Sequence, residues 1–96
     1  MEVTILLGSS SDMPVAEKCT KILKQFDVTY QLRVASAHRS PKFVEQIIHD
    51  AEADGCMVFI AMAGLAAALP GAVAALTTKP VIGVPCGGRV PFDSLL

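Results

Sequence analysis

The sequence predicts an α/β fold in which helices cover both faces of a parallel sheet. Short apolar runs alternate with amphipathic segments of helical length, and this order is typical of successive βαβ units. Hydrophobic residues make up 52% of the 96 residues and charged residues 18%. That composition suits a fully covered parallel sheet, an extensive contact with other subunits, or both. The length allows one domain, spanning residues 1–96.

Each element is justified by its local pattern. The strand-length runs occupy residues 3–8, 28–34, 57–61 and 80–85. The helical patterns occupy residues 13–26, 41–54 and 66–76, and another helix starts at 93. The first helix has Pro14 in its first turn and Ser11 or Asp12 as its cap. Residues at helical spacing predict its buried stripe: Val15, Cys19, Ile22, Leu23 and Phe26. The second helix has an equivalent stripe: Phe43, Val44, Ile47, Ile48 and Ala51.

Composition also argues against several classes of protein. The net charge is -1 and no basic stripe is present, which disfavours a nucleic-acid partner. Residues 56–76 carry no charge over the length of a membrane span, but Gly64, Pro70 and Gly71 divide them into a strand, a turn and a helix. We therefore expect no membrane segment. Three separated cysteines and no visible secretory signal favour a reduced, cytoplasmic setting.

The candidate functional residues follow the predicted strands. Parallel sheets bind ligands at the carboxyl ends of their strands, and four polar or glycine-rich segments fall there: 8–12, 36–39, 63–69 and 85–89. The spacing of His, Cys, Asp and Glu residues matches no metal site. We read His49 as solvated surface, Cys19 as core, and Cys86 as a residue that could line the site without being a nucleophile.

The first segment, GSSSD, joins a strand to a helix. Amide groups at a helix start attract anions, and the hydroxyls of Ser9 and Ser11 add donors. A phosphate cradle beginning at Gly8 fits this pattern, and so does a well-capped helix. The segment is neither a Walker motif nor a dinucleotide fingerprint. Asp12 disfavours a phosphate directly above it, but its carboxylate can hold ribose hydroxyls.

The second and third segments add a proton carrier and a close-packing surface. His38 titrates near neutrality and Arg39 suits a phosphate or carboxylate, although such a pair is also common in helix caps. Ser36 and Ala37 complete this segment. In AGLAAALPG, residues 63–71, Gly64 allows either a planar ligand or a neighbouring helix to approach the backbone closely.

Five motifs in this order, GSSSD, SAHRS-P, AGLAAALPG, TKPVIGVP and DSLL, resemble one family over essentially the whole chain. It is the family of the phosphoribosylaminoimidazole carboxylase catalytic subunit and N5-carboxyaminoimidazole ribonucleotide mutase of purine biosynthesis, most like its archaeal members. The resemblance implies a flavodoxin-like three-layer αβα fold assembled as an octamer with shared sites. It also implies carboxylate transfer from the exocyclic nitrogen of an aminoimidazole ribonucleotide to ring carbon 4, through trapped carbon dioxide and without a cofactor or metal.

The resemblance assigns roles to particular residues. His38 is implied to be the catalytic acid and base. The remaining residues are implied to bind substrate: Gly8, Ser9, Ser11, Asp12, Ser36, Ala37, Arg39, Ala63, Gly64 and Leu69. Ribose and phosphate would lie against the serines, Asp12 and Arg39. The imidazole and carbon dioxide would lie against the segment from Ala63 to Leu69.

Two departures from the family keep alternatives open. In the mutases, the loop has a second histidine at the position of Ala68. In the related class that uses free carbon dioxide, polar residues stand at the positions of Ala66 and Ala67. The alternatives are thus a mutase, a carboxylase using free carbon dioxide, and a non-catalytic nucleotide-binding homologue. Family members also continue past Leu96 through another strand and C-terminal helices. We expect a sheet without that strand to expose apolar surface and to be poorly soluble as a monomer.

Overall fold

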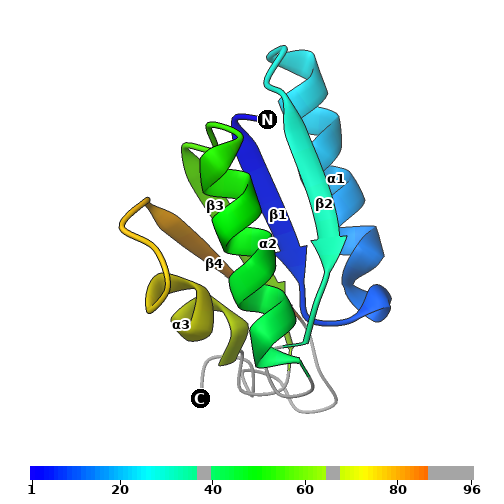
Figure 1. Ribbon diagram of the computed structural model, residues 1–96. Helices are drawn as coiled ribbons and strands as arrows, with labels where there is room; N and C mark the ends of the chain where they lie inside the picture. The colour runs from blue at the N-terminus through cyan, green and yellow to red at the C-terminus, as the bar shows by residue number, and fades with distance from the viewer. Residues whose placement is uncertain (37–39, 65–67, 87–96) are drawn as a thin grey trace.

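The computed structural model describes residues 1–36, 40–64 and 68–86 of the chain. Strands and helices alternate along it, as predicted (Figure 1). In chain order, the elements are β1 (Val3–Leu7), the 3-10 turn η1 (Ser10–Asp12), α1 (Met13–Gln25), β2 (Tyr30–Val34), α2 (Pro41–Ala53), β3 (Val58–Ala63), α3 (Ala68–Ala74) and β4 (Val81–Pro85).

The four strands form one parallel sheet in the order β2-β1-β3-β4. Ile5 in β1 pairs with Leu32 of β2 on one side and with Ile60 of β3 on the other. All five residues of β1 are buried, whereas β2 and β4 at the two edges are more exposed. The short apolar run at the start of the chain is therefore the centre of the sheet.

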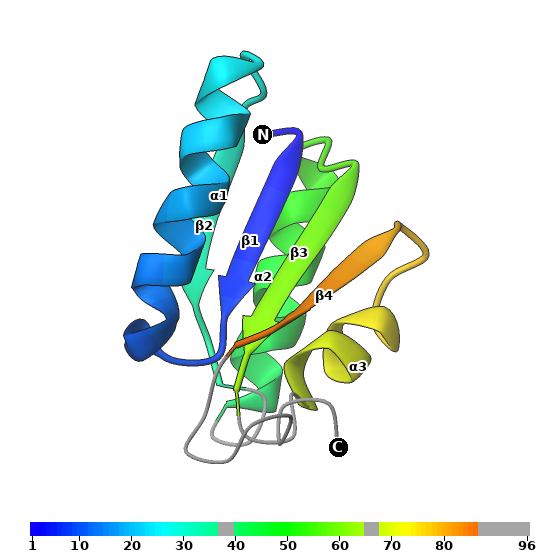
Figure 2. The ribbon, with the colours of Figure 1, turned by 180° about the vertical axis from the view of Figure 1, so that it is seen from behind.

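The elements are arranged in three layers, which confirms the predicted flavodoxin-like architecture. Helix α1 covers one face of the sheet, and α2 and α3 cover the other (Figures 1 and 2). Two apolar clusters lie between these layers, one on each face of the sheet. Because β1 and β3 contribute alternate residues to the two clusters, both strands are buried on both faces, as expected for a covered parallel sheet.

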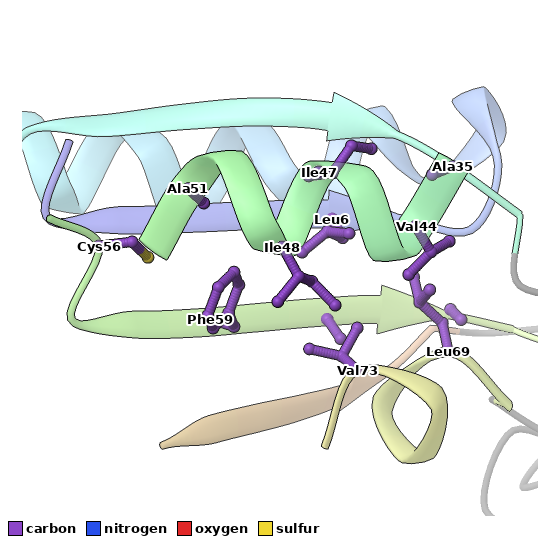
Figure 3. Packing of buried hydrophobic residues seen from close by; sticks show 12 residues of the cluster. Leu6, Ala35, Val44, Ile47, Ile48, Ala51, Cys56, Phe59, Leu69 and Val73 are labelled. Carbon is purple, nitrogen blue, oxygen red and sulfur yellow. The ribbon is translucent and has the colours of Figure 1, made fainter. Parts of the chain in front are cut away.

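The cluster under α2 and α3 contains the largest buried side chain, Phe59 (Figure 3). Val44, Ile47, Ile48 and Ala51 of the predicted stripe all lie in it. Thr4 is also fully buried on this sheet, and its hydroxyl accepts a hydrogen bond of 3.0 Å from the amide of Gln31 on β2. The polar group in the core is thus satisfied, which avoids the cost of an unpaired buried hydroxyl.

Phe43 is a correction to the predicted stripe of α2, since its side chain is 44% exposed. The ring lies under the guanidinium of Arg33 on β2, whose Cζ is 5.6 Å from the ring centroid. The aromatic face attracts the cation and shields its apolar stem. Phe43 therefore covers a charged side chain at the edge of the sheet instead of filling the core.

The predicted stripe of α1 is wrong at two positions. Ile22 is 54% exposed and Phe26 75% exposed. The face that packs on the sheet is centred on the fully buried Ala16, with Leu23 half-buried beside it. Consecutive helical residues differ by about 100° in direction, so Ile22 points away when Leu23 faces inward. Phe26 lies beyond the last residue of the helix.

The remaining differences concern element ends. Asp12 is the N-cap residue of α1, as one of the two predicted alternatives had it, but its side chain makes no capping hydrogen bond. The Ser9 side chain caps the preceding turn η1. Strand β3 continues to Ala63 because Ala63 still pairs with Pro85 of β4. The uncharged stretch 56–76 is divided between β3 and α3, and no helix of the described ranges is long and apolar enough to cross a membrane. The helix predicted at 93 lies outside those ranges.

Candidate functional site

Backbone hydrogen bonds hold the carboxyl ends of the four described strands together, at one end of the sheet. The amide of Gly8 donates to the carbonyl of Met62 at 2.9 Å, and that of Ala35 donates to Leu7 at 2.8 Å. On the other side, the amide of Cys86 donates to Ala63 at 2.9 Å. The carboxyl edge of a parallel sheet is where ligands bind in such folds. We call this edge, with the segments that follow the strands, the candidate site.

Gly8 permits a close approach of two chain segments at this edge. A Cβ atom added to Gly8 would lie 3.1 Å from the Cβ of Ala63 and 3.7 Å from its Cα. Ala63 is buried at the end of β3, and its Cβ has no torsion that could move it aside. The absence of a side chain at Gly8 therefore sets the spacing between the first turn and the third strand.

The turn after Gly8 presents two hydroxyl groups. The Ser9 hydroxyl accepts hydrogen bonds from the amide of Ser11 at 3.2 Å and from the Ser11 hydroxyl at 3.0 Å. Both side chains are exposed. Ser9 also anchors the turn through its carbonyl, which accepts from the amide of Asp12 at 3.0 Å. The turn can thus offer the proton of the Ser9 hydroxyl to a ligand while its own backbone stays fixed.

Asp12 is the buried charge of the site. Its side chain is only 8% exposed, at the start of α1. Within residues 1–36, 40–64 and 68–86 no basic side chain forms an ion pair with it. A buried carboxylate without a cation is costly and is found where a ligand or a specific donor compensates it. Asp12 is thus suited to accept hydrogen bonds from ligand hydroxyls.

Cys86 follows β4 and is only 3% exposed. Its thiol donates to the carbonyl of Val84, with 3.9 Å between sulfur and oxygen. Burial raises the pKa of the Cys86 thiol, and the negative charge of Asp12 raises it further. The thiol is therefore kept protonated and able to donate. This agrees with the prediction that Cys86 is no nucleophile, since a nucleophilic cysteine needs a lowered pKa.

The other predicted residues have more varied positions. Ser36 is half-buried, and its carbonyl accepts from the amide of Ser40 at 3.0 Å, just before α2. Gly64 follows the end of β3 at the same edge. The Leu69 side chain is 2% exposed and packs in the core beside α2, so only its backbone could face a ligand (Figure 3). Ala37, His38 and Arg39 lie outside the described residues.

Several other features lie away from this edge. His49 is exposed on α2, as predicted, and lines an open hollow of about 540 Å³ together with Glu52 and Leu76. None of the residues predicted for the site lines that hollow. Cys19 is half-buried and packs against the core cluster beneath α1, in agreement with its predicted place in the core. The part of the chain that the structure describes has no group of His, Cys, Asp and Glu able to hold a metal ion.

Sequence reasoning did not find that the charge of Asp12 raises the pKa of the Cys86 thiol. The two residues are far apart in sequence, and nothing in the motif GSSSD indicates this neighbour. The available signal was topological, because both residues lie in segments that follow the carboxyl end of a strand. The position of β4 in the sheet is also needed, and the local pattern does not encode it.

Proteins of known sequence and structure are similar to this chain. A 55% identical relative is the N5-carboxyaminoimidazole ribonucleotide mutase of Methanocaldococcus jannaschii, aligned over 98% of this chain and 59% of its own length. The mutase of Pyrococcus abyssi is 47% identical, over 99% of this chain and 56% of its own. The crystal structure of Treponema denticola PurE superposes with a TM-score of 0.85 and 38% identity, over 90% of this chain and 55% of that one.

These relatives are longer than the chain, which spans less than two thirds of each. The match to the family described as AIR carboxylase nevertheless covers residues 2–96. It thus includes all four strands and every segment of the candidate site. The chain belongs to the AIR carboxylase family.

Proposed function

We propose that the chain acts in purine biosynthesis, converting N5-carboxyaminoimidazole ribonucleotide to 4-carboxy-5-aminoimidazole ribonucleotide. The observation that carries this proposal is the buried Asp12 carboxylate beside the exposed hydroxyls of Ser9 and Ser11, at the carboxyl edge of the sheet. This set offers acceptors to ribose hydroxyls and donors to a phosphate. Relatives of 55% and 47% identity bear the name of this mutase.

Each predicted site residue would bind a particular part of the nucleotide. Ser9, Ser11 and Ser36 would hold the phosphate and ribose, with Arg39 as the cationic anchor and Asp12 on the ribose hydroxyls. The close contact between Gly8 and Ala63 would keep the floor of the site flat. Ala63, Gly64 and the backbone up to Leu69 would then pack against the imidazole. Ala37 would carry the backbone between Ser36 and the catalytic histidine.

The reaction needs one proton to be moved. Loss of the carboxylate from the exocyclic nitrogen produces carbon dioxide and leaves that nitrogen with a new proton. Carbon 4 then attacks the trapped carbon dioxide and loses its own proton, so the two transfers balance. We assign this transfer to His38, since histidine gives and takes protons near neutral pH. No step in this scheme requires a metal or an organic cofactor.

Other parts of the proposal concern assembly and surroundings. We propose an octamer in which subunits share sites, as the family resemblance implies, working in the cytoplasm. Three cysteines without a disulfide are compatible with a reducing compartment. Carbon dioxide would be held inside the site during transfer and not taken up from solution.

Ala68 supports a second candidate function. It is exposed at the first residue of α3, where the mutase loop has a histidine. A relative named phosphoribosylaminoimidazole carboxylase, from Candida glabrata, is 46% identical over 90% of this chain but only 15% of its own length. Carboxylation of aminoimidazole ribonucleotide by free carbon dioxide is therefore the alternative. A chain that binds the nucleotide without turnover is the non-catalytic alternative.

One assay separates these functions. The purified protein would be given the N5-carboxylated nucleotide in one reaction, and aminoimidazole ribonucleotide with bicarbonate in another. We expect product above the uncatalysed background from the first reaction only. Product from the second reaction alone would identify a carboxylase. Product in neither, with nucleotide binding retained, would identify a non-catalytic homologue.

The role of His38 has its own test. We expect His38→Asn to lose turnover by a factor of about 100 or more, the usual contribution of a positioned acid and base, while nucleotide binding measured by calorimetry stays close to normal. His49→Asn, which changes an exposed histidine on α2, is the matched control and should turn over normally. Retained turnover in His38→Asn would remove His38 from the mechanism.

A further inference from the structure

We propose that Gly83 is a positioning residue for the imidazole side of the candidate site. Its lack of a side chain lets the first turn of α3 lie close to β4. The position of that turn sets how far the backbone of Leu69 stands from Ala63 and Gly64. The proposal rests on the function proposed above and adds a residue to it. Gly83 is assigned no contact with the nucleotide.

The backbone at Gly83 does not itself require glycine. The residue lies in the middle of β4 and has no positive φ. Glycine weakens the interior of a strand, because it has no side chain to pack and loses more conformational freedom on folding than other residues. Glycine in a strand often marks the close approach of another segment. The surroundings of Gly83 therefore account for a glycine at this position.

The first turn of α3 approaches Gly83 closely (Figure 2). A Cβ atom added to Gly83 would lie 3.2 Å from the Cβ of Pro70 and 3.4 Å from its Cγ. Both atoms belong to the pyrrolidine ring, which is closed onto the backbone and cannot rotate aside. A side chain at position 83 would therefore displace the backbone of the helix and not merely a flexible group.

The sheet surface beneath this turn consists of small residues. Gly83 is paired with Ala61 of β3, and the Ala61 side chain lies in the cluster under α2 and α3. Ala63 is the next residue of β3 on the same face, toward the carboxyl edge. In the opposite direction this face carries a larger pair, Phe59 and Val81. The helix can thus come closest to the sheet near the carboxyl edge, where its first turn meets Gly83.

The same turn determines the position of one side of the candidate site. Leu69 directly precedes Pro70, and its side chain is 2% exposed in the core cluster. The backbone of Leu69 therefore moves with the turn. Ala63 and Gly64 stand at the end of β3, held by the sheet. The function proposed above places the imidazole against both groups, so the spacing between them depends on the contact between α3 and β4.

The first experiment tests the contact without any nucleotide. The urea midpoint of unfolding would be measured for Gly83→Ala in the wild type and in Pro70→Gly, which lacks both ring atoms that the new Cβ would meet. We expect Gly83→Ala to lower the midpoint in the wild type, because of overpacking. In Pro70→Gly it should raise the midpoint, because only the reduced freedom of the unfolded chain remains. The same change in both backgrounds would overturn the proposal, since the two positions would then be independent.

The second experiment tests the consequence for binding. We expect Gly83→Ala to raise the Kd for aminoimidazole ribonucleotide and the KM of the proposed reaction about three- to tenfold, because a small displacement of a binding surface weakens its contacts. The Kd for ribose 5-phosphate should stay unchanged, because this ligand has no imidazole. A general loss of structure would weaken the binding of both ligands.

Two further variants make this comparison specific. Gly71→Ala is the matched control, because it adds the same methyl group to α3 at a position where no atom lies within 4 Å of the new Cβ. It should leave both Kd values close to those of the wild type. In the Pro70→Gly background, Gly83→Ala should change neither Kd, because the contact that displaces the helix is absent.

The experiments distinguish the two proposals from each other. Normal affinity for aminoimidazole ribonucleotide in Gly83→Ala, or an equal loss of affinity for both ligands, would overturn the role of Gly83 and leave the proposed function intact. Absence of nucleotide binding by the wild type, with the coupling between positions 83 and 70 present, would overturn the proposed function and with it the role given to Gly83.

Discussion

The absence of a side chain at Gly8 allows the first turn to lie close to the end of β3, and a single added methyl group would disturb this spacing. We expect Gly8→Ala to lower the free energy of unfolding by about 1–2 kcal/mol, because the new Cβ would lie 3.1 Å from that of the buried Ala63. Gly71→Ala is the matched control. No atom lies within 4 Å of a Cβ at Gly71 in α3, so that variant should gain about 0.5–1 kcal/mol from helix propensity. Urea unfolding of both variants measures this difference, and equal stabilities would contradict it.

At the same scale, the candidate site could be predicted where residue chemistry and position coincide. Ser9, Ser11 and Asp12 follow a recognisable buried strand, so their place at the carboxyl edge followed from topology alone. The burial of Asp12 could not be predicted. It depends on how α1 lies on the sheet, which is a tertiary property and leaves no local pattern.

At the scale of elements, the order of strands and helices was predictable because apolar residues repeat every two residues in a strand and every 3.6 residues in a helix. The side of α1 that faces the sheet was harder to predict, because its apolar residues spread over more than one stripe. Ile22 and Leu23 are neighbours in sequence, yet the first is 54% exposed and the second packs against the sheet. Because Ala16 is small, its side of α1 approaches the strands most closely. A prediction that counts large apolar side chains along the helix does not take this residue into account.

This orientation of α1 leads to a prediction. We expect Leu23→Ala to destabilise the fold by about 1–3 kcal/mol, since it removes apolar atoms from the cluster beneath the helix. Ile22→Ala removes as many atoms from an exposed position and should change stability by less than about 0.5 kcal/mol. Both variants keep helix propensity high, so the comparison isolates packing. A larger loss for Ile22→Ala in thermal or urea unfolding would mean that α1 is rotated on the sheet.

At the scale of the whole molecule, the three layers were predictable and the edges of the sheet were not. Alternation of strands and helices implies a covered parallel sheet, but local patterns do not say which strands are neighbours. The order β2-β1-β3-β4 puts β4 at an edge, with Ile82 52% exposed. Ile82 pairs with Ile60, whose side chain lies in the cluster on the α1 face. That face is thus apolar up to the outermost described strand.

The exposed edge leads to a prediction about association. Among the described strands, β4 pairs only with β3, so its other side presents backbone donors and acceptors beside an apolar side chain. Such edges promote association, and a lysine on the edge opposes it. We expect the purified chain to self-associate in sedimentation velocity, and Ile82→Lys to shift it toward smaller species. Ile22→Lys adds the same charge at a similarly exposed position on α1, away from the strand edge, and should shift it less. A monodisperse monomer of the unmodified chain would contradict the prediction, and equal shifts in the two variants would attribute the effect to net charge instead of to the edge.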